Sequence, residues 1–151
     1  MKKFSFGLQH VLEWRGEQVE SEKIKLRRLF DERHALEAAG ELLDREQAEE
    51  ERSVRSQANL EAQQLSALDA FRRHVKNEKL RLTGRIADCG RRIAEQRQRL
   101  LDVRRQFRLL ERMKQRDWEA WNRALAAETD ALAAEAHLAQ WIKLNRRSAN
   151  R

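Results

Sequence analysis

Apolar residues recur alternately three and four residues apart along two long segments of the chain. Seven of the eleven positions spaced this way between residues 8 and 43 carry a large apolar side chain, and fourteen of the twenty between residues 65 and 131 are apolar. We call these the seam positions. A period of 3.5 residues sustained over this length is typical of a helix whose apolar face is covered by another helix. Strict apolar–polar alternation, the pattern of a half-buried strand, is absent. The spacing therefore predicts an all-helical protein.

Composition supports long helices over the main competing class. Charged residues make up 38% of the 151 residues, and the chain contains no proline. Ala, Glu, Leu, Arg and Gln dominate, as in coiled coils. A disordered chain can be equally polar, but nothing would preserve its apolar period. The composition and the period together favour a coiled coil.

The seam pattern is interrupted between residues 47 and 64, where Val54 and Leu60 are the only large aliphatic residues. Ser and Asn side chains in this interval can bond to the local backbone and so end or cap a helix. We expect the chain to reverse between about 53 and 62. Asn59 and the segment Ser66-Ala67-Leu68-Asp69 are the candidate caps of the following helix.

The expected fold is an elongated antiparallel two-helix coiled coil, a helical hairpin with a longer, overhanging C-terminal helix. It forms one domain over residues 1–151, with helices over about 4–53 and 60–145 and a disordered tail over 146–151. Pairing back from the reversal places Phe4 near residue 112, and later residues overhang. One unbroken helix that dimerises is the alternative.

The expected overhang carries aromatic residues at helical spacing. Trp118, Trp121 and Leu125 lie on one helix face, and Trp side chains often anchor protein partners. Alternatively, the two Trp residues pack on Phe4 and Phe6 or inside a dimer. In either case the two Phe residues can fasten the start of the first helix onto the second.

Charge is distributed unevenly along the chain, whose formal net charge is +7. Residues 72–116 hold sixteen Lys or Arg against five Asp or Glu, a net of +11, and residues 41–52 have a net charge of −4. A basic stretch of this kind can bind nucleic acid, an anionic membrane or an acidic protein. The simpler interpretation is a solvated helix face balanced by its neighbour.

Residue patterns for chemistry are missing from the sequence. The single cysteine, Cys89, occupies a seam position between Ile86 and Ile93, which is typical of a small core residue. The four His residues are scattered, and the glycines form no phosphate-binding loop. We therefore expect no enzyme activity, catalytic residue, cofactor, metal or small-molecule substrate. No apolar run of 18 residues and no secretory signal occur, so the expected location is the cytoplasm.

The N-terminal segment carries the most specific motif. Its residues are Phe4, Phe6, Leu8, Gln9, Val11, Leu12 and Arg15, followed by Glu17, Glu20 and Glu22. This pattern resembles the start of the flagellar FliJ proteins. Leu110-Glu111-Arg112, Trp118 and Asp130-Ala131-Leu132-Ala133 resemble the C-terminal part of that family. The resemblance covers almost the whole chain, including the two heptad arms and the polar reversal.

The resemblance implies a non-enzymatic stalk of the flagellar type III protein export apparatus, similar in shape to the related injectisome protein YscO. Such a stalk binds the export ATPase hexamer, promotes its activity, links it to the cytoplasmic domain of the export gate protein FlhA, and escorts export chaperones. It would serve flagellum biogenesis, protein transport and chemotaxis, in the cytoplasm and peripherally at the cell membrane of the flagellar base.

Two sets of contact residues follow. The expected ATPase-binding residues are Phe4, Phe6, Trp118, Trp121 and Leu125. The export-gate contacts that the resemblance implies are Leu43, Leu68, Phe71, Val75 and Leu82, with ordinary seam packing as the alternative for each. Nucleic acid is not an expected partner under this interpretation. A nucleic-acid-binding basic coiled-coil arm and a purely structural coiled-coil dimer remain the alternative functions.

Overall fold

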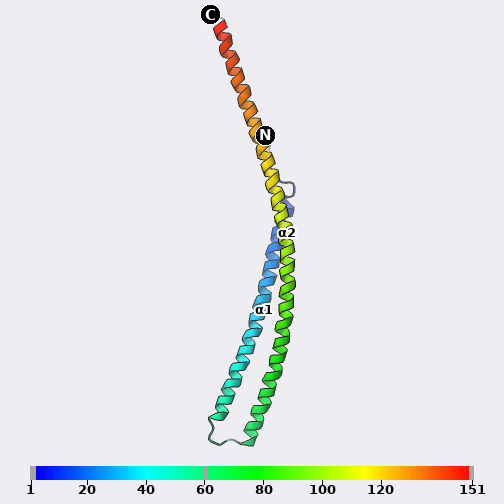
Figure 1. Cartoon of the computed structure of the whole chain (residues 1–151), viewed down its shortest axis with the longest axis vertical. Coiled ribbons are helices and arrows are strands. Elements are labelled where there is room, and N and C mark those ends of the chain that lie inside the picture. The colour runs from blue at the N-terminus through cyan, green and yellow to red at the C-terminus, as the bar shows by residue number, and fades with distance from the viewer. Residues whose placement is uncertain (1–2, 60, 150–151) are drawn as a thin grey trace. The chain divides into compact units, whose positions relative to one another are not determined.

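The computed structural model of the protein describes residues 3–59 and 61–149, and only the backbone of residues 146–149. It contains two helices, α1 (Gln9–Arg55) and α2 (Ala62–Ala149), and no strand among the described residues. The helices run antiparallel and pack against each other (Figure 1). The prediction of an all-α helical hairpin with a longer C-terminal helix is confirmed.

Both outer ends of the helices differ from the predicted bounds. Residues 3–6 are not helical, and the backbone N–H of Gln9 donates to the carbonyl of Phe6 (3.1 Å) as α1 begins. At the other end α2 continues through Ala149, where a disordered tail was expected from residue 146. No glycine or proline after Gly90 interrupts the helix, which explains its length. Residues 150–151 of the expected tail lie outside the described residues.

The reversal lies between the end of α1 at Arg55 and the start of α2 at Ala62. The Ser56 hydroxyl donates to the Ser53 carbonyl (2.8 Å) at the end of α1. Glu61 caps the start of α2. Its backbone N–H donates to the side-chain oxygen of Gln64 (3.2 Å), and its carbonyl accepts from the Gln64 N–H (3.0 Å). This is the returning half of a capping box, so neither predicted cap provides it.

The chain divides into two compact units where the sequence suggested one domain. One unit comprises Gln18–Val103, and the other comprises Met1–Glu17 with Arg104–Arg151. We call them the seam unit and the terminal unit.

The seam unit is built on the predicted seam positions. Leu36, Cys89 and Ile93 form its buried core cluster. The Cys89 thiol is fully buried and donates to the Leu29 carbonyl (3.3 Å), in keeping with a small core residue. Partly buried apolar side chains pack around this cluster: Leu26, Leu29, Phe30, Leu82 and Ile86.

Polar residues at seam positions make contacts across the two helices. The side-chain amide of Gln96, which is 6% exposed, donates to the backbone carbonyl of Glu22 (3.2 Å) and to its carboxylate. Hydrogen bonds from Lys25 and then from Gln96 lower the pKa of the Glu22 carboxyl below its ordinary value. The interruption of the apolar pattern is thus a hydrogen-bonded layer, which favours one register of the two helices.

The acidic stretch 41–52 faces the start of the basic stretch 72–116. Arg72 Nε lies 3.0 Å from Glu51 Oε1, and Lys79 forms an ion pair with Asp44. Hydrogen bonds from Gln47 and then from Arg72 lower the pKa of Glu51. Acidic residues of α1 therefore balance part of the basic stretch on α2. This agrees with the simpler interpretation of the charges, a solvated helix face balanced by its neighbour.

The terminal unit buries little apolar surface. Phe6 and Leu12 are its buried hydrophobic residues among those described. Gly16 faces Phe107, because a Cβ atom built there would lie 3.4 Å from Cε2 of Phe107, at van der Waals distance. Further along α2, every residue from 126 to 145 is exposed. We call residues 126–145 the exposed segment.

Candidate partner-binding site

Aromatic residues from the non-helical N-terminal segment and from α2 meet in the terminal unit. The rings of Phe4 and Trp121 lie 5.9 Å apart between centroids and are tilted by 53°. Such a tilted pair contributes about 0.5–1.5 kcal/mol beyond its buried area. This contact lies further along α2 than the predicted neighbourhood of residue 112. The reason is that the non-helical residues 3–6 reach further per residue than a helix does.

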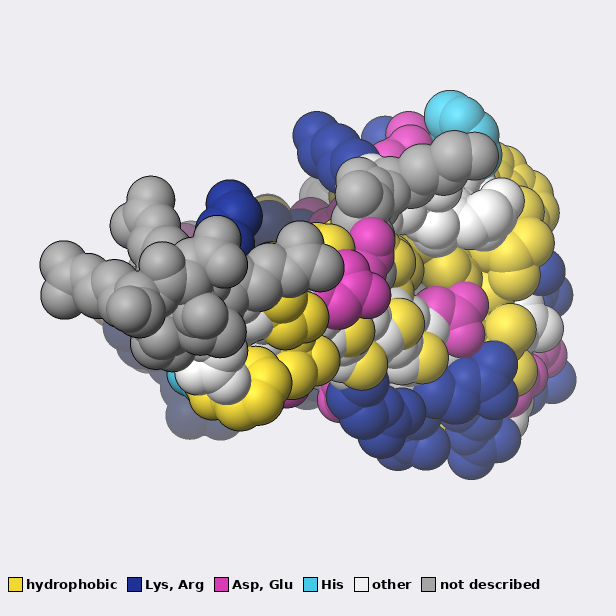
Figure 2. Space-filling model, turned by 90° about the horizontal axis from the view of Figure 1, so that it is seen from above, with side chains coloured by type: hydrophobic (Ala, Val, Ile, Leu, Met, Phe, Trp, Pro, Cys, Tyr) yellow, Lys and Arg dark blue, Asp and Glu magenta, His cyan; other side chains and the backbone are white. Residues whose placement is uncertain are grey.

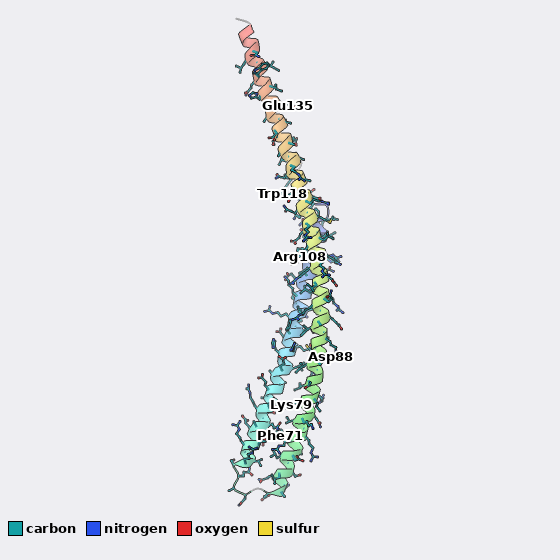
Figure 3. The ribbon with its side chains drawn as sticks, viewed as in Figure 1. Phe71, Lys79, Asp88, Arg108, Trp118 and Glu135 are labelled. Atoms are coloured by element: carbon teal, nitrogen blue, oxygen red, sulfur yellow. The ribbon has the colours of Figure 1, made fainter. Side chains whose placement is uncertain are left out.

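An open groove lies beside this aromatic pair. It has a volume of about 620 Å³ and is lined by Phe4, Leu12, Glu111, Lys114, Gln115 and Trp118. Trp118, labelled in Figure 3, is 42% exposed and forms part of its wall. An apolar groove with an accessible Trp and charged residues at its margin suits a side chain from a protein partner.

The five residues expected at the ATPase end occupy different positions in this arrangement. Phe4 and Trp118 line the groove, and Trp121 holds Phe4 in place. Leu125 lies one turn beyond Trp121 and is half-buried. Phe6 is buried, so it fastens the N-terminal segment and offers no surface to a partner. The structure thus brings four of the five residues to an accessible part of the unit.

A second exposed apolar surface of the terminal unit was missed from the sequence. Val11 and Trp14 on α1 and Leu8 just before it are all exposed, and the Arg15 guanidinium lies 4.7 Å from the centroid of the Trp14 ring. The signal was available, because Val11 and Trp14 fall between seam positions and therefore point outward. The Trp–Arg contact keeps the indole ring partly covered.

The expected export-gate residues separate into two groups. Val75 is 1% exposed and Leu82 packs against the core cluster, so both belong to the seam. Leu68 and Phe71 line an open groove near the reversal together with Val54, and Phe71 is labelled in Figure 3. Leu43 is half-buried. Val75 and Leu82 therefore take part in seam packing, which was the alternative for each residue. Leu68 and Phe71 offer accessible surface.

Other apolar residues of the seam unit are more exposed than the predicted contacts. Leu42, Leu65 and Leu80 are each about half exposed or more. Leu42 and Leu80 lie outside the seam positions, so their exposure follows from the same period that predicted the core. Leu65 occupies a seam position, but it lies in the first turn of α2.

Cationic side chains from both helices line another groove of the seam unit. They are Lys25, Arg28, Arg92 and Arg99, accompanied by Glu32 and Glu95. Arg92 donates to both carboxylate oxygens of Glu32 (3.2 and 3.1 Å). The local excess of positive charge makes this groove a candidate for anionic ligands.

Across residues 3–59 and 61–149, no three His, Cys, Asp or Glu side chains gather in a way that could hold a metal ion. Neither α1 nor α2, over the part of the chain that the structure describes, has a stretch apolar and long enough to cross a membrane.

Comparison of the chain with protein-family models, with curated proteins and with solved structures finds no significant match.

Proposed function

We propose that this protein is a non-enzymatic stalk of a flagellar type III export apparatus, of the kind found in the FliJ family. It would bind the export ATPase hexamer and promote its activity, link it to the export gate and escort export chaperones. The observation that carries the proposal is the exposed segment, which follows the aromatic groove of Phe4 and Trp118 along α2.

The dimensions of the exposed segment suit insertion into a ring. Twenty helical residues span roughly 30 Å, with a diameter of about 10–12 Å including side chains. Seven of the twenty are alanines, which keep such a rod slim. The exposed Trp118 and its groove would rest against the ATPase where the rod enters.

The apolar groove near the reversal carries a separate part of the proposal. Leu68 and Phe71, with Val54, line the apolar groove near the reversal and are the proposed contacts with the export gate. A protein that reaches both partners would work at the cytoplasmic side of the cell membrane, at the flagellar base.

The test is a titration of the protein into purified flagellar export ATPase from the same organism, following ATP turnover and hexamer formation. The variant Trp118→Ala removes an exposed groove residue, and Trp14→Ala, equally exposed on α1, is its matched control. We expect stimulation by the wild type and by Trp14→Ala, and reduced stimulation by Trp118→Ala. Absence of both binding and stimulation by the wild type would refute the stalk function. Equal stimulation by the two variants would move the contact away from the groove.

A nucleic-acid-binding arm is the second candidate, and the cationic groove favours it. Arg28 and Arg99 enter this groove from α1 and α2, so a phosphate could contact both helices. Binding of this kind weakens steeply with salt. The double variant Arg28→Gln/Arg99→Gln should then reduce binding to RNA or DNA and flatten its salt dependence. An unchanged affinity would exclude the groove as the contact.

A further inference from the structure

Several large apolar side chains of the exposed segment are in contact with solvent. Leu132, Leu138 and Trp141 are each 58% exposed, and Ile142 and Leu144 are also exposed. Figure 2, which views the whole molecule from above, shows hydrophobic side chains at the surface next to acidic and basic ones. Apolar surface of this extent commonly marks a protein contact.

Part of this surface follows the spacing of a coiled-coil seam. Ala127, Ala131, Ala134, Leu138 and Trp141 are separated alternately by four and three residues, so they lie along one face of α2. Three small residues at one end of the face and two large ones at the other make it asymmetric. The face would pack best against a second helix with its large residues at the opposite end.

Charge is asymmetric in the same direction. Residues 124–137 contain Glu128, Asp130 and Glu135 with no Lys or Arg, a net charge of −3. Residues 138–149 contain Lys143, Arg146 and Arg147 with no Asp or Glu, a net charge of +3. The boundary between the two halves falls at Leu138, where the small residues of the apolar face give way to the large ones.

We infer that a second copy of this chain packs antiparallel on this face, centred on Leu138. In an antiparallel pair, the acidic half of each copy faces the basic half of the other. A parallel pair would instead place acidic against acidic and basic against basic. Antiparallel pairing also places Trp141 of one copy beside Ala134 of the other, so a large side chain meets a small one. The size pattern and the charge pattern therefore select the same partner and the same orientation.

This dimer goes beyond the proposed stalk function and does not depend on it. The two uses exclude each other, since a segment covered by a second copy cannot also enter a ring. Self-association would keep the apolar face covered until another partner displaces the second copy. Self-association is measured on the purified 151-residue chain alone, so its outcome is separate from that of the ATPase titration.

The first experiment reverses the charges of each half. One variant is Glu128→Lys/Asp130→Lys/Glu135→Lys, and the other is Lys143→Glu/Arg146→Glu/Arg147→Glu. Lys and Glu are good helix formers, and the helical circular dichroism signal checks that α2 is retained. Sedimentation equilibrium should give a doubled mass for the wild type, a single mass for each variant, and a doubled mass for their equimolar mixture. Glu46→Lys/Glu49→Lys, which changes exposed residues of α1, is the control and should remain dimeric.

The second experiment tests the orientation by disulfide formation. Leu138→Cys should cross-link to itself, whereas Ala131→Cys and Asn145→Cys should each cross-link only when the two are mixed. The wild-type chain is the control, because its single cysteine, Cys89, is fully buried. Self-cross-linking of Ala131→Cys would indicate a parallel pair and overturn the inference. A wild type that stays monomeric up to about 1 mM would overturn it too, as would a mixture of charge variants that fails to associate.

Discussion

Two stretches of the same helix behave in opposite ways. Between residues 75 and 100, in the seam unit, α2 buries Val75, Cys89, Ile93 and Leu100. Between residues 126 and 145, in the terminal unit, α2 buries nothing and every residue is exposed. Both stretches are regular helix, so helical structure in this chain does not require a covered apolar face.

The physical basis of helix formation differs between the two stretches. In the first, large apolar residues at a period of 3.5 gain stability from the opposite helix. In the second, alanine has the best intrinsic helix propensity and loses no side-chain entropy. An isolated helix of this length is marginal because nucleation is unfavourable, but here the turns extend a helix that is already formed. The comparison therefore predicts different responses to mutation.

The largest expected difference is between an apolar residue in each stretch. Ile93→Ala leaves a cavity in the core cluster and should lower the free energy of unfolding by about 2–5 kcal/mol. Leu132→Ala, in the exposed segment, should change it by about 0.5 kcal/mol or less. Urea titrations followed by circular dichroism at low protein concentration measure both. Similar losses for the two variants would contradict the distinction between the stretches.

The polar layer of the seam unit should give the next largest effect. Gln96→Ala removes the donor to the Glu22 carbonyl and carboxylate, and we expect a loss of about 1–3 kcal/mol. Gln140→Ala, in the exposed segment, is the matched control and should be close to neutral. The same urea titration measures both variants. A neutral Gln96→Ala variant would show that the layer contributes nothing to stability.

Glycine and alanine exchanges separate global from local stability. Gly40→Ala should raise the free energy of unfolding by roughly 0.5–1 kcal/mol, because nothing lies within 4 Å of the added methyl group. Ala133→Gly should instead speed amide hydrogen exchange in the exposed segment and leave the urea midpoint unchanged. A lower midpoint for Ala133→Gly would mean that the exposed segment unfolds together with the rest of the chain.

The smallest expected effect concerns pH. The folded-state pKa of Glu51 is lowered by hydrogen bonds from Gln47 and Arg72. The resulting stabilisation is complete above the unfolded-state pKa and is lost as pH falls through the lowered folded-state pKa. Glu51→Gln should therefore reduce the acid-induced fall in the urea midpoint. Glu49→Gln, at an exposed position, serves as the control, and an identical pH profile for the two variants would exclude a role for the ion pair.

The seam pattern predicted the core because a period of 3.5 residues defines the helix face that a second helix can cover. Leu36, Cys89 and Ile93 all occupy seam positions and are all buried. The cap of α2 was not predictable in the same way. Glu61 and Gln64 form it with backbone and amide groups that many residues could supply, whereas the sequence offered stronger cap formers at Asn59 and Ser66.

The candidate site was predicted in part. Residue type and spacing indicated Trp118 and Trp121 as aromatic residues on one helix face. They did not distinguish Trp121, which packs on Phe4, from Trp118, which lines the groove. They also did not place Phe6, whose burial depends on how the non-helical N-terminal segment folds onto the helices.

The sequence by itself indicated long helices, the faces they bury and the interval in which the chain reverses, and it left a dimer of one unbroken helix as the alternative. These properties depend on period and propensity, which act locally along the chain. Only the tertiary structure decided which polar side chains at seam positions find a hydrogen-bond partner on the other helix, as Gln96 does with Glu22. It also decided which aromatic residues remain accessible. Those outcomes depend on the register between segments distant in sequence, since a side chain is covered only by what the opposite helix places there.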